Sequence, residues 1–202
     1  EGSAALGLHD SVSSDSVGWG FELADLDNDG NVEAAQASGP AMSGSGPNDG
    51  RPLPDLLWEG RADGTFERLI SQPTFGNTNN HLGVVTADLD GDGALEILVA
   101  GPGERPLLYR NRCNPNSWLE VGLEGPPGNA QGFGATVSVQ AGGRTWTRTL
   151  FASRGPAQGP PLLHFGLSTA DRIDRLQVTW PDGQRTVLSD VPLNRRVTVA
   201  AP

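Results

Sequence analysis

The C-terminal part of the chain is marked by short segments in which apolar and polar residues alternate. Leu176, Val178 and Trp180 are separated by single polar residues, and a period of two recurs at 137–139, 146–150 and 197–199. This period is typical of strands with one buried and one solvated face. The segment 181–183 reads as a turn that closes a hairpin. We therefore predict a small β-sandwich of about seven or eight strands.

The N-terminal part contains an internal repeat. The segment 20–33 aligns with the segment 83–96 at a constant offset of 63 residues. Each copy consists of an apolar strand, an acidic loop and a second apolar segment, and a further apolar strand follows, at 56–58 or at 107–109. A unit of about four short strands is typical of one blade of a β-propeller. We therefore predict an all-β chain in which two propeller-blade-like units precede the sandwich.

The composition supports this fold class and excludes some partners. Among the 202 residues are 28 Gly and 16 Pro, which argues against a helical bundle. No apolar run approaches the roughly 20 residues of a membrane-spanning helix, so no membrane span is expected. The net charge is −10 and all 14 cations are Arg, so nucleic acid is not an expected partner. A single Cys excludes an internal disulfide.

The charge is distributed unevenly between two parts of the chain. Residues 1–116 contain 18 acidic and six basic residues, whereas residues 117–202 contain six acidic and eight basic ones. Between two apolar stretches, the segment 111–117 is rich in turn-forming residues. We therefore predict two domains, 1–116 and 117–202, of which the first has a specific use for carboxylates.

The acidic loops of the repeat give the strongest chemical signal. In both loops carboxylates occupy positions 1, 3, 5 and 9, and a glycine, Gly30 or Gly93, occupies position 6. The carboxylates are Asp25, Asp27, Asp29 and Glu33 in the first loop and Asp88, Asp90, Asp92 and Glu96 in the second. Four carboxylates so close together repel one another strongly unless a cation lies between them.

The donor set indicates which cation such a loop would hold. A turn that directs alternate side chains inward gathers oxygens at about 2.3–2.6 Å, and the carbonyl at position 7, from Asn31 or Ala94, adds a ligand. Oxygen ligands without His or Cys favour Ca²⁺ over zinc or copper, and Mg²⁺ demands a tighter octahedron. A solvated acidic turn is the alternative, and the second copy makes it less favoured. An EF-hand is excluded, because position 12 is Gln36 or Val99 and no helices flank the loops.

On these residues the first part resembles the FG-GAP (VCBS-type) repeats of integrin α-subunit propellers and of many bacterial secreted proteins. Those repeats bind Ca²⁺ in the loop between two blade strands. The resemblance implies two Ca²⁺ sites, with the eight carboxylates as side-chain ligands and Asn31 and Ala94 as carbonyl ligands. The chain departs from the pattern at position 9, where Glu33 and Glu96 stand in place of the more common Asp.

The second part resembles another known domain. Its landmarks, in order, are the segments 116–121, 129–137, 164–167 and 178–183. In that order they are similar to the ASPIC/UnbV domain, which follows FG-GAP repeats in the cartilage acidic protein family and its bacterial relatives. This resemblance carries no established chemistry.

Signals for catalysis are weak by comparison. His9, His81 and His164 share no metal-ligand spacing, and the chain has no Gly-x-Ser-x-Gly motif. We expect a structural role for His164 in a strand and a solvated turn position for His81. Cys113 is expected to be packed or inert, with linkage to another chain as the alternative. Four tryptophans fall at strand spacing and are expected in the core, namely Trp58, Trp118, Trp146 and Trp180. The chain is therefore predicted not to be an enzyme.

Together these features predict a secreted calcium-binding structural or adhesion protein, outside the cell or at its surface, whose ligand is a protein or a surface glycan. Two alternatives stay open: a subunit of an extracellular polymer, and a carbohydrate-binding or enzyme-accessory module. Two blades alone leave faces and strand edges without partners. We therefore expect self-assembly or a longer parent chain, rather than packing of the second domain against the open face.

Overall fold

The structure is a computed structural model, and it describes residues 2–8, 17–39, 53–69, 78–112, 115–153, 155 and 157–202. Within these residues one short helix, α1 (Gly2–Ala5), accompanies strands only, so the prediction of an all-β chain is confirmed. The expectations for His9 and Cys113 fall outside the described residues.

The first blade-like sheet contains four antiparallel strands in the order β1-β2-β4-β5. They are β1 (Val17–Ala24), β2 (Glu33–Gly39), β4 (Leu56–Gly60) and β5 (Phe66–Arg68). One face of this sheet packs Ala34, Leu56 and Trp58 into a small core, against which Leu8 and Phe66 lie. The expected connection from strand to acidic loop to strand is therefore present, as the path from β1 to β2.

The second blade-like sheet repeats this plan with three described strands, in the order β7-β8-β9. They are β7 (Gly83–Ala87), β8 (Glu96–Ala100) and β9 (Leu107–Tyr109), and a two-stranded bridge joins β3 (Leu53–Pro54) to β6 (Thr78–Asn79). The two larger sheets stack face to face. Ala35 and Ala37 of β2 pack with Val84, Ile97 and Val99 of the second sheet in one buried cluster.

The C-terminal part is a two-sheet sandwich, with the strand orders β13-β10-β16 and β12-β11-β14-β15. Its strands are β10 (Trp118–Glu124), β11 (Thr136–Ala141), β12 (Arg144–Thr149), β13 (Leu162–Gly166), β14 (Arg175–Thr179), β15 (Arg185–Leu188) and β16 (Arg195–Ala200). The pair β10 and β16 is parallel, and the other pairs are antiparallel. The predicted hairpin around the turn 181–183 is present as β14 and β15.

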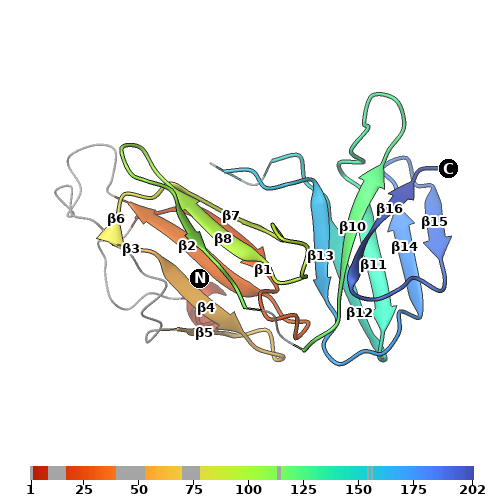
Figure 1. Ribbon diagram of the computed structural model, residues 1–202, viewed down its shortest axis with the longest axis horizontal. Helices are drawn as coiled ribbons and strands as arrows, with labels where there is room; N and C mark the ends of the chain where they lie inside the picture. The colour runs from red at the N-terminus through yellow and green to blue at the C-terminus, as the bar shows by residue number, and fades with distance from the viewer. Residues whose placement is uncertain are drawn as a thin grey trace.

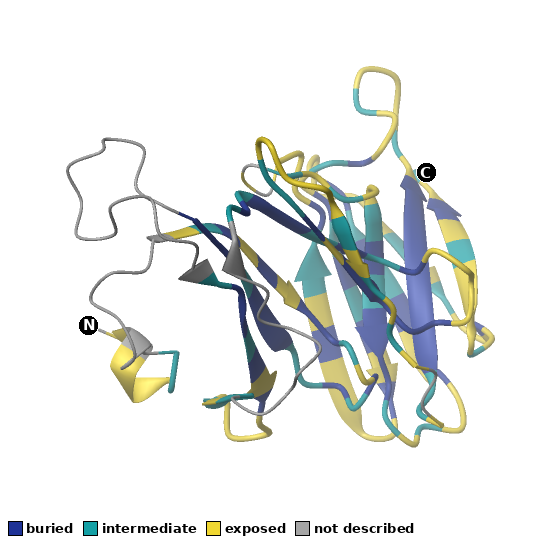
Figure 2. Ribbon diagram, turned by 60° about the vertical axis from the view of Figure 1, so that its left-hand side comes forward, coloured by how far each residue is buried: buried dark blue, intermediate teal, exposed yellow. Residues whose placement is uncertain are grey.

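The sandwich core follows the alternation seen in the sequence. Leu119 and Val121 from one sheet and Val137 and Val178 from the other are completely buried in a single cluster. Figure 2 shows the buried positions as bands along the facing strands. The four tryptophans expected in the core are all buried.

The two parts of the chain meet at the acidic loops. Among the described residues, no sheet spans the two parts: strands β1 to β9 end at residue 109, and strands β10 to β16 begin at residue 118. In Figure 1 the ends of the blade strands that carry the acidic loops point toward β10 and β13 of the sandwich. The fold therefore places the most acidic segments of the chain at the junction between the two parts.

Candidate metal centre

Both acidic loops occupy the same place in their sheets, between the first and the second strand. The first connects β1 to β2, and the second connects β7 to β8. Position 6 has a positive φ in each loop, 91° at Gly30 and 87° at Gly93, a conformation that residues with a Cβ rarely adopt. The glycines thus provide the sharp bend expected from the sequence.

In the first loop, hydrogen bonds to the backbone orient the aspartates. Asp25 Oδ2 accepts from the Gly30 amide at 3.0 Å, Asp27 Oδ1 from the Asp29 amide at 3.1 Å, and Asp29 Oδ1 from the Asn31 amide at 2.7 Å. Asp25, Asp27 and Asp29, oriented in this way, each offer one oxygen, and these oxygens lie within 4.8 Å of one another.

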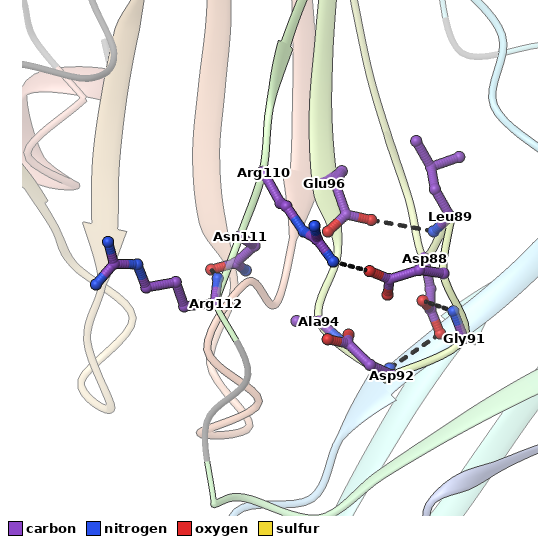
Figure 3. Close-up of polar contacts among 11 residues, drawn as sticks. Asp88, Leu89, Gly91, Asp92, Ala94, Glu96, Arg110, Asn111 and Arg112 are labelled. Atoms are coloured by element: carbon purple, nitrogen blue, oxygen red, sulfur yellow. Dashed lines mark hydrogen bonds and ion pairs between the residues drawn. The ribbon is translucent and has the colours of Figure 1, made fainter.

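The second loop is built in the same manner (Figure 3). Asp88 accepts from the amides of Gly91 and Gly93, at 2.7 and 3.0 Å. Here the oxygens that lie within 4.8 Å of one another come from Asp88, Asp90 and Glu96. Asp90 also forms an exposed ion pair with Arg110 at 2.5 Å.

The structure gathers three of the four predicted carboxylates in each loop, and the omitted one differs. In the first loop Glu33 is outside the cluster: its Oε2 accepts from the Leu26 amide at 2.6 Å, and its Oε1 is turned to the Gly60 amide at 3.3 Å. In the second loop Asp92 is outside it and accepts from the Ala94 amide at 2.8 Å. The carbonyls of Asn31 and Ala94 stay predicted ligands.

The glutamates at position 9 share a feature that the sequence did not indicate. Glu96 Oε2 accepts from the Leu89 amide at 3.0 Å, as Glu33 Oε2 does from the equivalent Leu26 amide. Figure 3 shows the Glu96 side chain reaching back across the loop to Leu89. An Asp at this position is one methylene shorter, so the choice of Glu is explained by this bond across the loop.

Each cluster contains a buried oxygen whose bonding is incomplete. Among the described residues, Asp25 Oδ1 and Glu96 Oε1 are buried without a hydrogen-bond partner, in side chains that are 1% and 4% exposed. A buried carboxylate oxygen without a partner is costly, and a bound cation supplies the missing interaction. The two clusters can therefore hold a metal ion, and their donors fit a hard one.

Burial and crowding in the first loop make its acids resist ionisation. Burial, together with the neighbouring Asp29 and Asp27, raises the pKa of Asp25 to about 7. Burial and the charges of Asp27 and Asp25 likewise raise the pKa of Glu33 to about 8. Without a cation the loop therefore retains protons at neutral pH, so a bound cation has to displace them.

Comparison with known families identifies both parts of the chain. The family profile described as FG-GAP-like repeat matches residues 44–99, and the profile described as ASPIC and UnbV matches residues 125–202. The chain combines an FG-GAP-like repeat with an ASPIC/UnbV domain. The resemblance inferred from the sequence is confirmed, in the expected order. No curated protein matches the chain.

The matched ranges bear differently on the two acidic loops. The second loop lies inside the FG-GAP match, whereas the first loop precedes it and is related by the internal repeat and by its geometry. The ASPIC/UnbV match begins just after β10, the strand that forms the centre of one sandwich sheet. Among the described residues, no helix is long and apolar enough to cross a membrane.

The expectation that His81 is a solvated turn residue was wrong. His81 is completely buried, and its Nδ1 lies 2.6 Å from Asp55 Oδ2. Asp55 Oδ1 in turn accepts from the amide of Ser38, which is also buried. The pair therefore joins β2 to the segment that enters the second blade, and a buried imidazole in this position is a structural link.

His164, predicted to be structural, lies in β13, and its Nε2 is 2.7 Å from Asn28 Oδ1 in the first acidic loop. Burial, with a contribution from the nearby Arg148, lowers the pKa of His164 to about 3, so the ring is neutral at physiological pH. Asn28 itself was missed by the sequence reasoning. The sequence signal was the residue type at loop position 4, which is Asn28 in the first repeat and Gly91 in the second. Asn and Gly adopt a positive φ more readily than other residues, and both have one here.

Proposed function

We propose that this chain is a calcium-binding structural or adhesion protein that works outside the cytoplasm, with one Ca²⁺ held by each acidic loop. The observation that carries the proposal is the buried, unpartnered carboxylate oxygen that each loop retains, on Asp25 and on Glu96. Two copies of the same loop, at the same place in two stacked sheets, make a chance arrangement of acids a poor explanation.

The choice of Ca²⁺ follows from the donors. Only carboxylates contribute to the two described clusters, and no His or Cys belongs to either of them. Hard oxygen donors select calcium, magnesium or manganese over zinc and copper, and loops that gather several carboxylates and a carbonyl suit the larger coordination number of Ca²⁺. Calcium concentrations outside cells are high enough to fill sites of only modest affinity. The FG-GAP-like match supports an extracellular place of work.

The same proposal assigns no bond chemistry to the chain. The buried pair of Asp55 and His81 has the arrangement of a general base and its orienting acid, but it is fully enclosed and cannot reach a substrate. The clustered carboxylates are accounted for by the metal. The four buried tryptophans do not form a surface platform for sugars, so a carbohydrate-binding module gains no support from them.

Calorimetric titration with Ca²⁺ tests the proposal. We expect the parent chain to bind two ions, and we expect Asp27→Ala and Asp90→Ala each to remove one of them. Asp182→Ala is the matched control, because Asp182 accepts the Gln184 amide in an exposed turn of the sandwich, outside both clusters. Two ions bound by Asp182→Ala, and none by a variant that combines Asp27→Ala with Asp90→Ala, would support the assignment. A parent chain that takes up no calcium would refute it.

A second candidate function, self-assembly, is favoured by an exposed face of the second blade. Val85, Leu98 and Leu108 are in register across β7, β8 and β9, and Leu98 and Leu108 are 38% and 54% exposed. The equivalent residues of the first blade, Ala35 and Leu57, are covered by the second blade. By the logic of the repeat, another blade fits on the exposed row.

On the opposite face of the first blade, Phe21 and Leu23 of β1 are exposed as well. A copy that presents this face to the exposed row of a neighbour forms a head-to-tail contact, which produces a ring or a filament. We therefore propose that, in a polymer, each copy stacks its first blade on the second blade of the next copy.

Sedimentation in calcium at micromolar concentration tests the second candidate. We expect the unmodified chain to sediment as an assembly heavier than the 21.1 kDa monomer. Leu98→Glu should sediment as the monomer, because a buried charge opposes blade stacking. Val187→Glu is the control, since Val187 is similarly exposed on β15 of the sandwich. A parent that is monomeric, or an assembly that Leu98→Glu leaves intact, would contradict this candidate.

A further inference from the structure

Asn28 connects three parts of the molecule from the middle of the first acidic loop. It is 2% exposed, and its Nδ2 donates to the Gly93 carbonyl of the second loop at 2.9 Å. Its Oδ1 lies 2.7 Å from Nε2 of His164, and its own carbonyl accepts from the Ser168 amide at 2.8 Å. One side chain and one carbonyl thus tie both acidic loops to β13 of the ASPIC/UnbV domain and to the residues that follow it.

The glycines at position 6 of the loops also touch the sandwich, Gly30 at the ASPIC/UnbV domain and Gly93 at β10, the strand just before it. Trp146 Nε1 donates to the Gly30 carbonyl at 2.8 Å. At Gly93 there is no room for a side chain, because a Cβ would stand 2.0 Å from the indole of Trp118. Arg144 adds a bond to the Asp29 carbonyl at 3.3 Å. The sandwich therefore contacts the backbone of both loops, with an indole against each sharp bend.

We propose that the ASPIC/UnbV domain positions the acidic loops, so that metal binding by the first loop and docking of the domain strengthen each other. This inference rests on the proposed binding of calcium. Metal binding requires one arrangement of the loop backbone, and the domain binds that same backbone at Asn28, Asp29 and Gly30. Without a cation, the clustered oxygens of Asp25, Asp27 and Asp29 either repel one another or retain protons, and both costs destabilise the loop backbone that the domain binds.

Coupling of this kind is reciprocal. If docking raises the affinity of the loop for calcium by some factor, calcium strengthens docking by the same factor. The domain needs no metal ligand of its own for this effect, because it acts through the residues that hold the ligands. Trp146, His164 and Ser168 are therefore positioning residues.

The second loop provides a matched comparison. Its position 4 is Gly91, which is exposed and has φ of 80°, and a Cβ there would meet no atom within 4 Å. Asn tolerates this conformation better than most residues. Asn28→Gly therefore removes the side-chain links from the first loop to Gly93 and His164. Gly91→Asn adds an inert side chain to the second loop, and both exchanges leave every carboxylate in place.

The first experiment is calorimetric titration with Ca²⁺, one loop at a time. With the second loop disabled by Asp90→Ala, we expect Asn28→Gly to weaken calcium binding at least about fivefold. With the first loop disabled by Asp27→Ala, we expect Gly91→Asn to leave calcium binding unchanged. Trp146→Phe keeps an aromatic ring and removes the donor to Gly30. It should likewise weaken calcium binding by the first loop, although it lies in the other domain.

The second experiment uses the unmodified chain and requires no variant to fold. The Ser168 amide donates across the junction, so its hydrogen exchange reports undocking. We expect it to exchange at least about fivefold faster in chelator than in calcium. The Gln184 amide, which donates to Asp182 in an exposed turn of the sandwich away from the junction, exchanges by local opening. It is the control and should not change.

The outcomes separate this inference from the proposed function. The coupling would be overturned if Asn28→Gly and Trp146→Phe left calcium binding unchanged and the exchange of the Ser168 amide did not depend on calcium. The proposed calcium sites would not be affected by that result. A parent chain that binds no calcium would overturn both. Weaker binding by the first loop together with calcium-dependent exchange at Ser168 would establish the coupling.

Discussion

Removing calcium should lower the melting temperature of the chain by roughly 10–20 °C. With about 1 mM calcium and a Kd of about 10 μM, each site stabilises the fold by about 2.7 kcal/mol through mass action. Two sites give about 5 kcal/mol, and 1 kcal/mol corresponds to roughly 2–4 °C for a chain of this length. The effect is also structural, because without a cation the buried oxygens of Asp25 and Glu96 lack partners.

Scanning calorimetry with calcium and with excess chelator measures this effect. Asp27→Ala and Asp90→Ala should each lower the melting temperature in calcium, and the difference from the parent should shrink in chelator, where no site is filled. Asp182→Ala should behave like the parent under both conditions. Equal melting of the parent with and without calcium would show that the metal does not hold this fold together.

The parts of the molecule that depend on local sequence were predictable. The repeat at an offset of 63 residues placed two equivalent loops between strands, and the bend at Gly30 and Gly93 follows from the need for a positive φ. The sandwich strands followed from alternation, as at Leu176, Val178 and Trp180, since a period of two places every second side chain in the core.

The parts that depend on distant partners were not predictable. His81 stands among polar residues in the sequence, which favours a solvated turn. In the fold it is buried and pairs with Asp55, which lies 26 residues away in the chain. Asn28 finds His164 at a separation of 136 residues, and no local pattern indicates such a pair. Which carboxylate leaves each cluster was equally hidden, because the Glu33 side chain is held by the amide of Gly60 in another strand.

Without metal, the stability of the chain should fall as the pH rises from 6.5 to 8. The pKa values of Asp25 and Glu33 are about 7 and about 8 in the folded state, above the ordinary values of 3.8 and 4.5, because both are buried beside other acids. A raised pKa contributes stability that is complete below the unfolded value and is lost as the pH rises through the folded one. Over this window the two groups together cost about 2 kcal/mol, or roughly 4–8 °C in melting temperature.

The window begins at pH 6.5 because His164 acts in the opposite direction below it. Its pKa is lowered from 6.5 to about 3, so its contribution is complete above 6.5 and is lost as the pH falls toward 3. Calcium binds the deprotonated loop, so with saturating calcium the decline between pH 6.5 and 8 should vanish, and the stabilisation by calcium should grow with pH. Asp25→Asn, which cannot ionise, should remove the Asp25 share of the decline in chelator. Parallel melting curves with and without calcium across this window would show that the acids of the first loop are not the groups that the metal neutralises.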